Sequence, residues 1–204
     1  MLIGIDFDNT LACYDRAFSL AARERGLVSE ANDLSKLEVR DCVRALENGE
    51  EHWKALQGEV YGKHIGEATL MPGAADFLLA CKARRVRVVI VSHKTEFGHF
   101  DRDRVNLRRA ARAWMRAQGF FDTDELGVDA RDVFFEGTRP EKVGRIGTLG
   151  CSHFIDDLEE VFQEPGFPKN VARFLFDPGG RVAQNQTFAR HSSWKSIKHA
   201  VFAT

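Results

Sequence analysis

Met1-Leu-Ile-Gly-Ile-Asp6-Phe-Asp8-Asn-Thr10-Leu11 begins this 204-residue chain with a short apolar run that ends in two acids. The run has the length of a buried strand, so Asp6 and Asp8 fall where the strand ends and the chain turns. In open α/β sheets, ligands bind at the edge formed by the carboxyl ends of the strands. Acids two residues apart on an extended strand point the same way, so both can face one substrate. We therefore expect the active site at Asp6 and Asp8, where this strand ends.

Similar apolar runs recur along the chain, with helical or mixed segments between them. This alternation is typical of a parallel sheet. The runs cover residues 2–7, 86–91, 133–135, 153–155 and 171–176. Four of them end in polar or acidic residues, namely Asp6 with Asp8, Ser92, Asp156 with Asp157, and Asp177. The sequence predicts an α/β protein with a three-layer, Rossmann-like parallel sheet core whose carboxyl edge is rich in acids.

The strand pattern is missing after the first strand. Three helix-like stretches replace it, near residues 15–26, 33–48 and 50–64. We interpret this region as a small all-helical cap, and Met71-Pro72-Gly73 marks the return to the core because proline and glycine interrupt regular structure. The predicted domains are a core of residues 1–14 and 70–204 and a cap of residues 15–69.

Composition excludes several classes of protein. The net charge is −1, from 29 basic and 30 acidic residues, so it gives no general attraction to nucleic acid or to an anionic membrane. We expect no membrane partner, since no apolar run approaches the ~18 residues that span a bilayer. The four cysteines are far apart with no C-x-x-C pair, which suits reduced thiols and a cytoplasmic protein. The oligomeric state stays open.

Four motifs in this order resemble the haloacid dehalogenase superfamily of Mg-dependent phosphohydrolases. They are Asp6-Phe-Asp8-Asn-Thr10, Val-Val-Ile-Val-Ser92, Lys142, and Phe-Ile-Asp156-Asp157. The resemblance implies a phosphatase acting on a small phosphorylated metabolite. Family members with dehalogenase activity lack the acid two residues after the nucleophile, so Asp8 favours phosphate chemistry.

Elementary chemistry explains why these residue types occur together. A phosphate dianion repels a carboxylate, so Asp6 can attack phosphorus only if a cation neutralises both charges, and Mg²⁺ prefers such oxygen ligands. Asp6 and Asp156 are the expected side-chain ligands, with Asp157 as a further one. The resemblance adds the backbone carbonyl of Asp8.

The expected reaction proceeds in two steps. Attack by Asp6 gives an aspartyl-phosphate, while Asp8 protonates the leaving oxygen and later takes a proton from water. Ser92 and Lys142 are expected to bind the phosphoryl oxygens and to balance their charge, and His93 could reach the same group.

Some assignments stay open at this stage. Lys142 lies in the glycine-rich stretch 141–150, which is expected to make a poor helix, and Lys94 is the competing phosphate-binding lysine. Asp156 and Asp157 could instead cap a helix beginning at Leu158.

Three other functions compete with hydrolysis. A phosphotransferase or mutase would use the same Asp6 nucleophile with a different acceptor. A weakly active regulatory or binding protein could keep the same fold. A nucleic-acid end phosphatase is suggested only by a basic stripe, Arg104, Arg108, Arg112 and Arg116, and such a stripe is more often a solvated helix face.

Overall fold

The chain folds into two compact units. The computed structural model describes residues 1–29, 34–98, 103–183 and 187–203. The first unit comprises Met1–Leu11, Leu70–Lys94 and Gln118–Thr204, and the second comprises Ala12–Thr69 and Thr95–Ala117.

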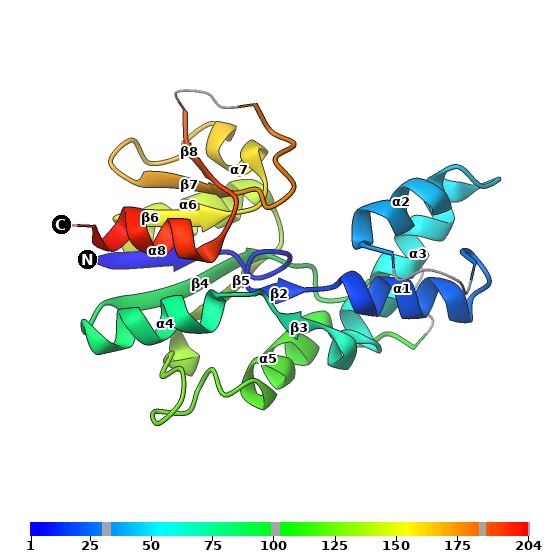
Figure 1. The fold of residues 1–204 in the computed structure, drawn as a ribbon, viewed down its shortest axis with the longest axis horizontal. Helices are drawn as coiled ribbons and strands as arrows, with labels where there is room; N and C mark the ends of the chain where they lie inside the picture. Colours follow the sequence, from blue (N-terminus) through cyan, green and yellow to red (C-terminus); the bar gives the residue numbers. More distant parts are fainter. Residues whose placement is uncertain (30–33, 99–102, 184–186, 204) are drawn as a thin grey trace. The chain divides into compact units, whose positions relative to one another are not determined.

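A six-stranded parallel sheet forms the centre of the first unit (Figure 1). Its order is β5-β4-β1-β6-β7-β8. The strands are β1 (Leu2–Ile5), β4 (Arg87–His93), β5 (Val133–Glu136), β6 (His153–Asp156), β7 (Ala172–Phe176) and β8 (Ala189–His191). The predicted parallel α/β sheet is confirmed, and β8 is a further edge strand.

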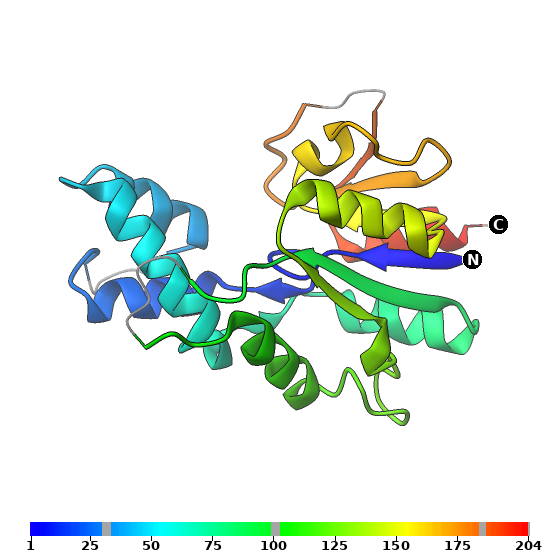
Figure 2. The same ribbon diagram turned by 180° about the vertical axis from the view of Figure 1, so that it is seen from behind.

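Helices cover both faces of this sheet. On one face, Trp194 of α8 (Trp194–Phe202) packs on Phe77 of α4 (Ala74–Ala83), with ring centroids 5.0 Å apart. On the other face, α6 (Arg139–Leu149) and α7 (Glu159–Gln163) bury apolar side chains against β4, β6 and β7. Figure 2 shows α6 on the side opposite to α4 and α8. The three-layer, Rossmann-like architecture is therefore confirmed.

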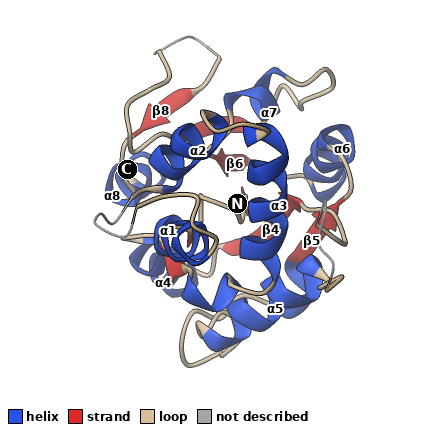
Figure 3. Cartoon of the chain, turned by 90° about the vertical axis from the view of Figure 1, so that its right-hand side faces the viewer, coloured by secondary structure: helices blue, strands red, loops and turns tan. Residues whose placement is uncertain are grey.

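The second unit is mainly helical (Figure 3). Its helices are α1 (Asp15–Glu24), α2 (Lys36–Arg44), α3 (Gly49–Gly62) and α5 (Leu107–Ala117), with a 3₁₀ turn η1 (Ile65–Glu67). Phe18 stacks on Trp53 with centroids 5.0 Å apart, and Tyr61 packs edge-on against Phe18. The short strands β2 (Ala12–Cys13) and β3 (Thr69–Leu70) form a separate two-stranded sheet. None of the helices described by the structure is long and apolar enough to cross a membrane.

Residues 95–117 group with the helical unit, whereas the sequence predicts them in the core. The indole Nε1 of Trp114 donates a hydrogen bond to the carbonyl of Ala68 (3.0 Å), so α5 is tied to the end of the helical segment. Arg104 precedes α5 and has a φ of 48°. The basic stripe on this helix therefore begins at Arg108.

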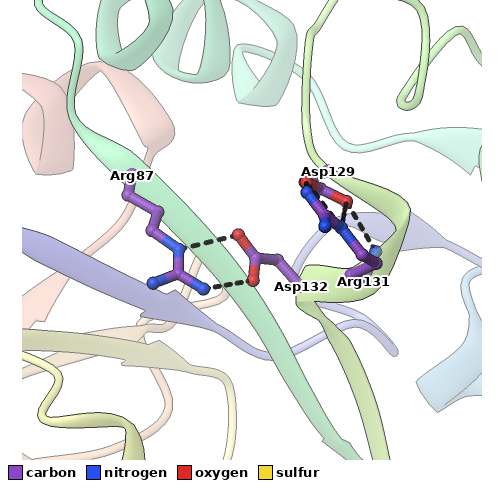
Figure 4. Close-up of polar contacts among 4 residues, drawn as sticks. All are labelled: Arg87, Asp129, Arg131 and Asp132. Carbon is purple, nitrogen blue, oxygen red and sulfur yellow. Dashed lines mark hydrogen bonds and ion pairs between the residues drawn. The ribbon is translucent and has the colours of Figure 1, made fainter.

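Ion pairs close the amino edge of the sheet in the first unit (Figure 4). Arg87, at the start of β4, donates from Nε and Nη2 to the two carboxylate oxygens of Asp132 (2.8 and 2.6 Å), in the 3₁₀ turn η2 (Ala130–Asp132) before β5. Arg131 binds Asp129 in the same loop and lowers the pKa of that carboxyl to about 2. Each arginine is thus paired with an aspartate, and the four charges of these groups neutralise one another in pairs.

Thiol labelling can test the core packing. Cys81 and Cys151 are buried, and burial raises the pKa of Cys81 to about 12 and that of Cys151 to about 11, whereas Cys42 is exposed. Because the thiolate is the reactive form, we expect a thiol reagent to label Cys42 rapidly in the native protein and the buried pair only after unfolding. Mass spectrometry of the labelled peptides, with Cys42→Ser as control, measures this. Rapid native labelling of Cys81 would contradict the fold described here.

Candidate active site

The candidate site lies at the carboxyl edge of the three central strands of the first unit. β1 lies between β4 and β6, and Ile5 pairs with Ile90 on one side and Ile155 on the other. The backbone N–H of Asp6 donates to the carbonyl of Ile155 (2.9 Å), so Asp6 extends the strand by one residue. This register brings Asp6 beside Asp156, at the end of β6.

A tight turn after β1 orients Asp8. Asn9 has a φ of 61°, a left-handed conformation that asparagine tolerates. The N–H of Leu11 donates to the carbonyl of Phe7 (3.0 Å), and the indole of Trp194 donates to the carbonyl of Thr10 (3.1 Å). The turn is thus held by its own backbone and by the buried indole of α8.

Lys142 bridges two buried carboxylates. Its Nζ lies 2.6 Å from Oδ1 of Asp6 and 2.6 Å from Oδ2 of Asp156. The three side chains are almost fully buried, with 2%, 6% and 0% of their surface exposed, respectively. Burying charges is costly unless they are paired and hydrogen-bonded, and this group is both.

The charges of this group alter one another's protonation. Burial alone would lower the pKa of Lys142, but the carboxylates of Asp156 and Asp6 outweigh it and raise the pKa above its ordinary value. Burial raises the pKa of Asp156 to about 7, although Lys142 acts in the opposite direction. The lysine is therefore a firmly held cation next to Asp6.

The helix that carries Lys142 is well formed, so the expectation of a poor helix is wrong. The hydroxyl oxygen of Thr138 accepts a hydrogen bond from the N–H of Glu141, and the carboxylate of Glu141 accepts one from the N–H of Thr138, which together form a capping box. Pro140 occupies the first turn, where it costs no hydrogen bond. Gly150 ends the helix with a φ of 71°. These end signals outweigh the internal glycines.

Three carboxylates form a group that could hold a metal ion. One oxygen from each of Asp6, Asp156 and Asp157 lies within 4.8 Å of the others. The hydroxyl of Thr10 donates to Oδ1 of Asp157 at 3.4 Å, and the N–H of Leu158 donates to Oδ1 of Asp156 at 3.0 Å. Hard carboxylate oxygens are the ligands that Mg²⁺ accepts. The residues present therefore fit the expected cofactor.

The helix after β6 begins at Glu159, one residue later than the sequence predicts. The residue before α7 is Leu158, and it makes no side-chain cap hydrogen bond. Asp156 instead accepts from the N–H of Leu158 in a turn of the Asx type. The carboxylate of Asp157 belongs to the three-carboxylate group, and its capping role stays a prediction.

Asp8 has a different partner. The Nζ of Lys94 lies 3.0 Å from its Oδ1 and 2.8 Å from its Oδ2. The carboxylate of Asp8 is not part of the group formed by Asp6, Asp156 and Asp157. The sequence indicates Lys94 only as a competing phosphate ligand and does not reveal this ion pair, for which its sole signal is a lysine two residues after Ser92.

Ser92 and His93 differ in burial. Ser92 is 1% exposed, two residues beyond the Ile90 that pairs with β1. His93 is exposed, and its Nε2 lies 3.0 Å from the carbonyl of Gly137. Because a carbonyl only accepts, Nε2 carries the proton in this contact and Nδ1 remains for a ligand.

Comparison with known proteins identifies the fold. No protein-family model matches the chain, and no curated protein matches it. A HAD family hydrolase from Deinococcus radiodurans R1 is similar, with a TM-score of 0.59 and 14% sequence identity over 98% of this chain and 94% of that one. Protein tyrosine kinase A from Mycobacterium tuberculosis has a TM-score of 0.58 and 15% identity over 98% of this chain and 97% of that one. A predicted phosphoglycolate phosphatase from Haemophilus somnus 129PT has a TM-score of 0.54 and 16% identity over 98% of this chain and 97% of that one. The chain has the fold of the haloacid dehalogenase superfamily.

Proposed function

We propose that this protein is a Mg²⁺-dependent phosphatase that hydrolyses a small phosphate monoester through an aspartyl-phosphate on Asp6. The observation that carries the proposal is the buried group of Asp6, Lys142 and Asp156 beside Asp157, at the sheet edge where α/β proteins bind ligands. A carboxylate paired with a buried cation beside a possible metal site has the charge environment that phosphoryl transfer needs. A similar solved structure, from Deinococcus radiodurans R1, was determined with bound phosphate and sodium.

In the first step, an oxygen of Asp6 forms a bond to phosphorus as the bond between phosphorus and the ester oxygen breaks. Asp8 donates its proton to the leaving oxygen, so the alcohol departs neutral. In the second step, Asp8 takes a proton from water, the water oxygen attacks phosphorus, and the carboxylate of Asp6 is released with inorganic phosphate. The first step uses the proton of Asp8 and the free carboxylate of Asp6, and the second step restores both.

The remaining residues bind and orient the phosphoryl group. Ser92 donates a hydrogen bond to a phosphoryl oxygen, and Lys142 supplies positive charge. His93 stays a prediction for the same site, with Nδ1 as its available atom. The side chains of Asp6, Asp156 and Asp157 and the backbone carbonyl of Asp8 would hold Mg²⁺. When bound, Mg²⁺ would neutralise the charge on phosphate and nucleophile.

We propose that the helical unit acts as a cap that excludes water and selects the leaving group. The predicted cap, residues 15–69, accounts for most of this unit, and residues 95–117 extend it. Small soluble metabolites are the expected substrates, since a cap leaves little room for a folded one.

Removal of the metal tests the cofactor. Phosphate release from a panel of sugar phosphates, nucleotides and small phospho-acids should fall by at least about a hundredfold when EDTA is present, and excess Mg²⁺ should restore it. A colorimetric phosphate assay measures both. Release that persists undiminished in EDTA would exclude the proposed role of Asp6, Asp156 and Asp157 as metal ligands.

A phosphotransferase with the same nucleophile is the second candidate. The observation that favours it is the similarity to the solved structure of protein tyrosine kinase A. Product analysis separates the two, because a transferase passes the phosphoryl group to an added alcohol or sugar whereas a phosphatase releases inorganic phosphate. Binding of phosphate esters without turnover of any panel member would instead indicate a regulatory protein.

A further inference from the structure

A second buried lysine lies at the same sheet edge and is fixed at both ends. The backbone N–H of Lys94 donates to the carbonyl of Glu136 at 3.0 Å, which ties it to the end of β5. Its Nζ lies within 3.0 Å of both carboxylate oxygens of Asp8 and 5.6 Å from the ring centroid of Phe7. Only 2% of the Lys94 side chain is exposed, against 17% for Asp8.

The two buried lysines hold different carboxylates. The ammonium of Lys142 contacts Asp6 and Asp156, both members of the three-carboxylate group. The ammonium of Lys94 contacts Asp8, which is not a member. The carboxylate suited to proton transfer is thus held apart from those suited to binding metal, and a separate lysine holds it.

We infer that Lys94 is the positioning residue for Asp8, holding its carboxylate toward the leaving oxygen and outside the three-carboxylate group. This inference rests on the proposed function. A general acid works only within hydrogen-bond reach of the atom that it protonates, and an aspartate side chain without a fixed partner would sample other rotamers. Contact with both oxygens restricts that freedom. One oxygen of Asp8 can carry the proton that goes to the leaving group, while the other oxygen keeps its contact with Nζ of Lys94.

The leaving group supplies the test. A poor leaving group, such as the alkoxide of a small alkyl phosphate, needs the proton from Asp8, whereas nitrophenolate leaves with little help. We expect Lys94→Met to slow alcohol release from the alkyl ester at least about tenfold more than nitrophenolate release from p-nitrophenyl phosphate, in single-turnover experiments with Mg²⁺. The ratio of the two rates is independent of the folded fraction, so partial loss of fold does not imitate the effect.

Two further variants sharpen the experiment. Lys94→Arg keeps a cation beside Asp8 and should recover part of the alkyl ester rate. Lys82→Met makes the same substitution at an exposed lysine of the first unit, whose Nζ contacts the carbonyl of Glu125, and should leave both rates unchanged.

Equal slowing of both esters by Lys94→Met, together with inorganic phosphate binding weakened about tenfold or more in calorimetry, would overturn the inference and make Lys94 a phosphate ligand. If the wild-type protein transfers phosphate from neither ester, the proposed function fails separately. Crystals of the wild type and of Lys94→Met then decide the positioning. A changed Asp8 rotamer supports the inference, and an unchanged one overturns it.

Discussion

Asp6→Asn is expected to lower Mg²⁺-dependent phosphate release by at least about a thousandfold. The amide has the shape of the carboxylate but is a far weaker nucleophile toward phosphorus, so no aspartyl-phosphate forms. The substitution also removes one carboxylate from the three-carboxylate group and one of the two negative charges that face Lys142. Phosphate release and intact-protein mass spectrometry of acid-quenched reactions measure turnover and the phosphorylated intermediate.

Asp124→Asn is the matched control for this variant. Asp124 belongs to the first unit and is exposed, so the same chemical change there should leave phosphate release unaltered. Circular dichroism checks that both proteins are folded. Retention of Mg²⁺-dependent release in Asp6→Asn, with the control active, would show that Asp6 is not the nucleophile.

The sequence predicts the centre of the sheet because the signal there is local. The apolar run before Asp6 and the run before Ser92 each form a strand of the parallel sheet. In contrast, β8 has three residues, of which two are Arg190 and His191, and no apolar alternation marks it. Its pairing with β7 depends on tertiary packing, which a local pattern does not contain.

Lys142 illustrates the limit for the site. Its position in the order of motifs could be predicted, but its contact with Asp6 spans 136 positions in the chain and depends on the sheet order. The grouping of residues 95–117 with the helical unit also depends on contacts between distant parts of the chain. The hydrogen bond from Trp114 to Ala68 is one such contact, and no local sequence pattern predicts it. The Lys94 pairing with Asp8 is equally non-local. The residue types at this sheet edge could be predicted from the sequence, whereas their partners could not.

Lys142→Met is expected to lower both stability and turnover. Methionine keeps the apolar stem but removes the ammonium that lies 2.6 Å from Asp6 and from Asp156, and it leaves two buried carboxylates facing each other without a cation. Removing one partner of a buried ion pair lowers the free energy of unfolding by about 3–5 kcal/mol. For a chain of this size, that loss corresponds to a fall in Tm of roughly 10 °C. Lost charge stabilisation should also lower turnover about a hundredfold or more.

Thermal melts with and without Mg²⁺ distinguish the origin of this loss. A cation bound to the folded state only raises its stability by mass action, and the variant has more unbalanced negative charge to offset than the wild type. Mg²⁺ should therefore raise the Tm of Lys142→Met more than that of the wild type, without restoring turnover. Lys195→Met, at an exposed position of α8, should melt like the wild type. A Lys142→Met protein that melts at the wild-type temperature would show that the buried lysine does not stabilise the fold, and equal Mg²⁺ shifts in both proteins would place the metal away from Asp6 and Asp156.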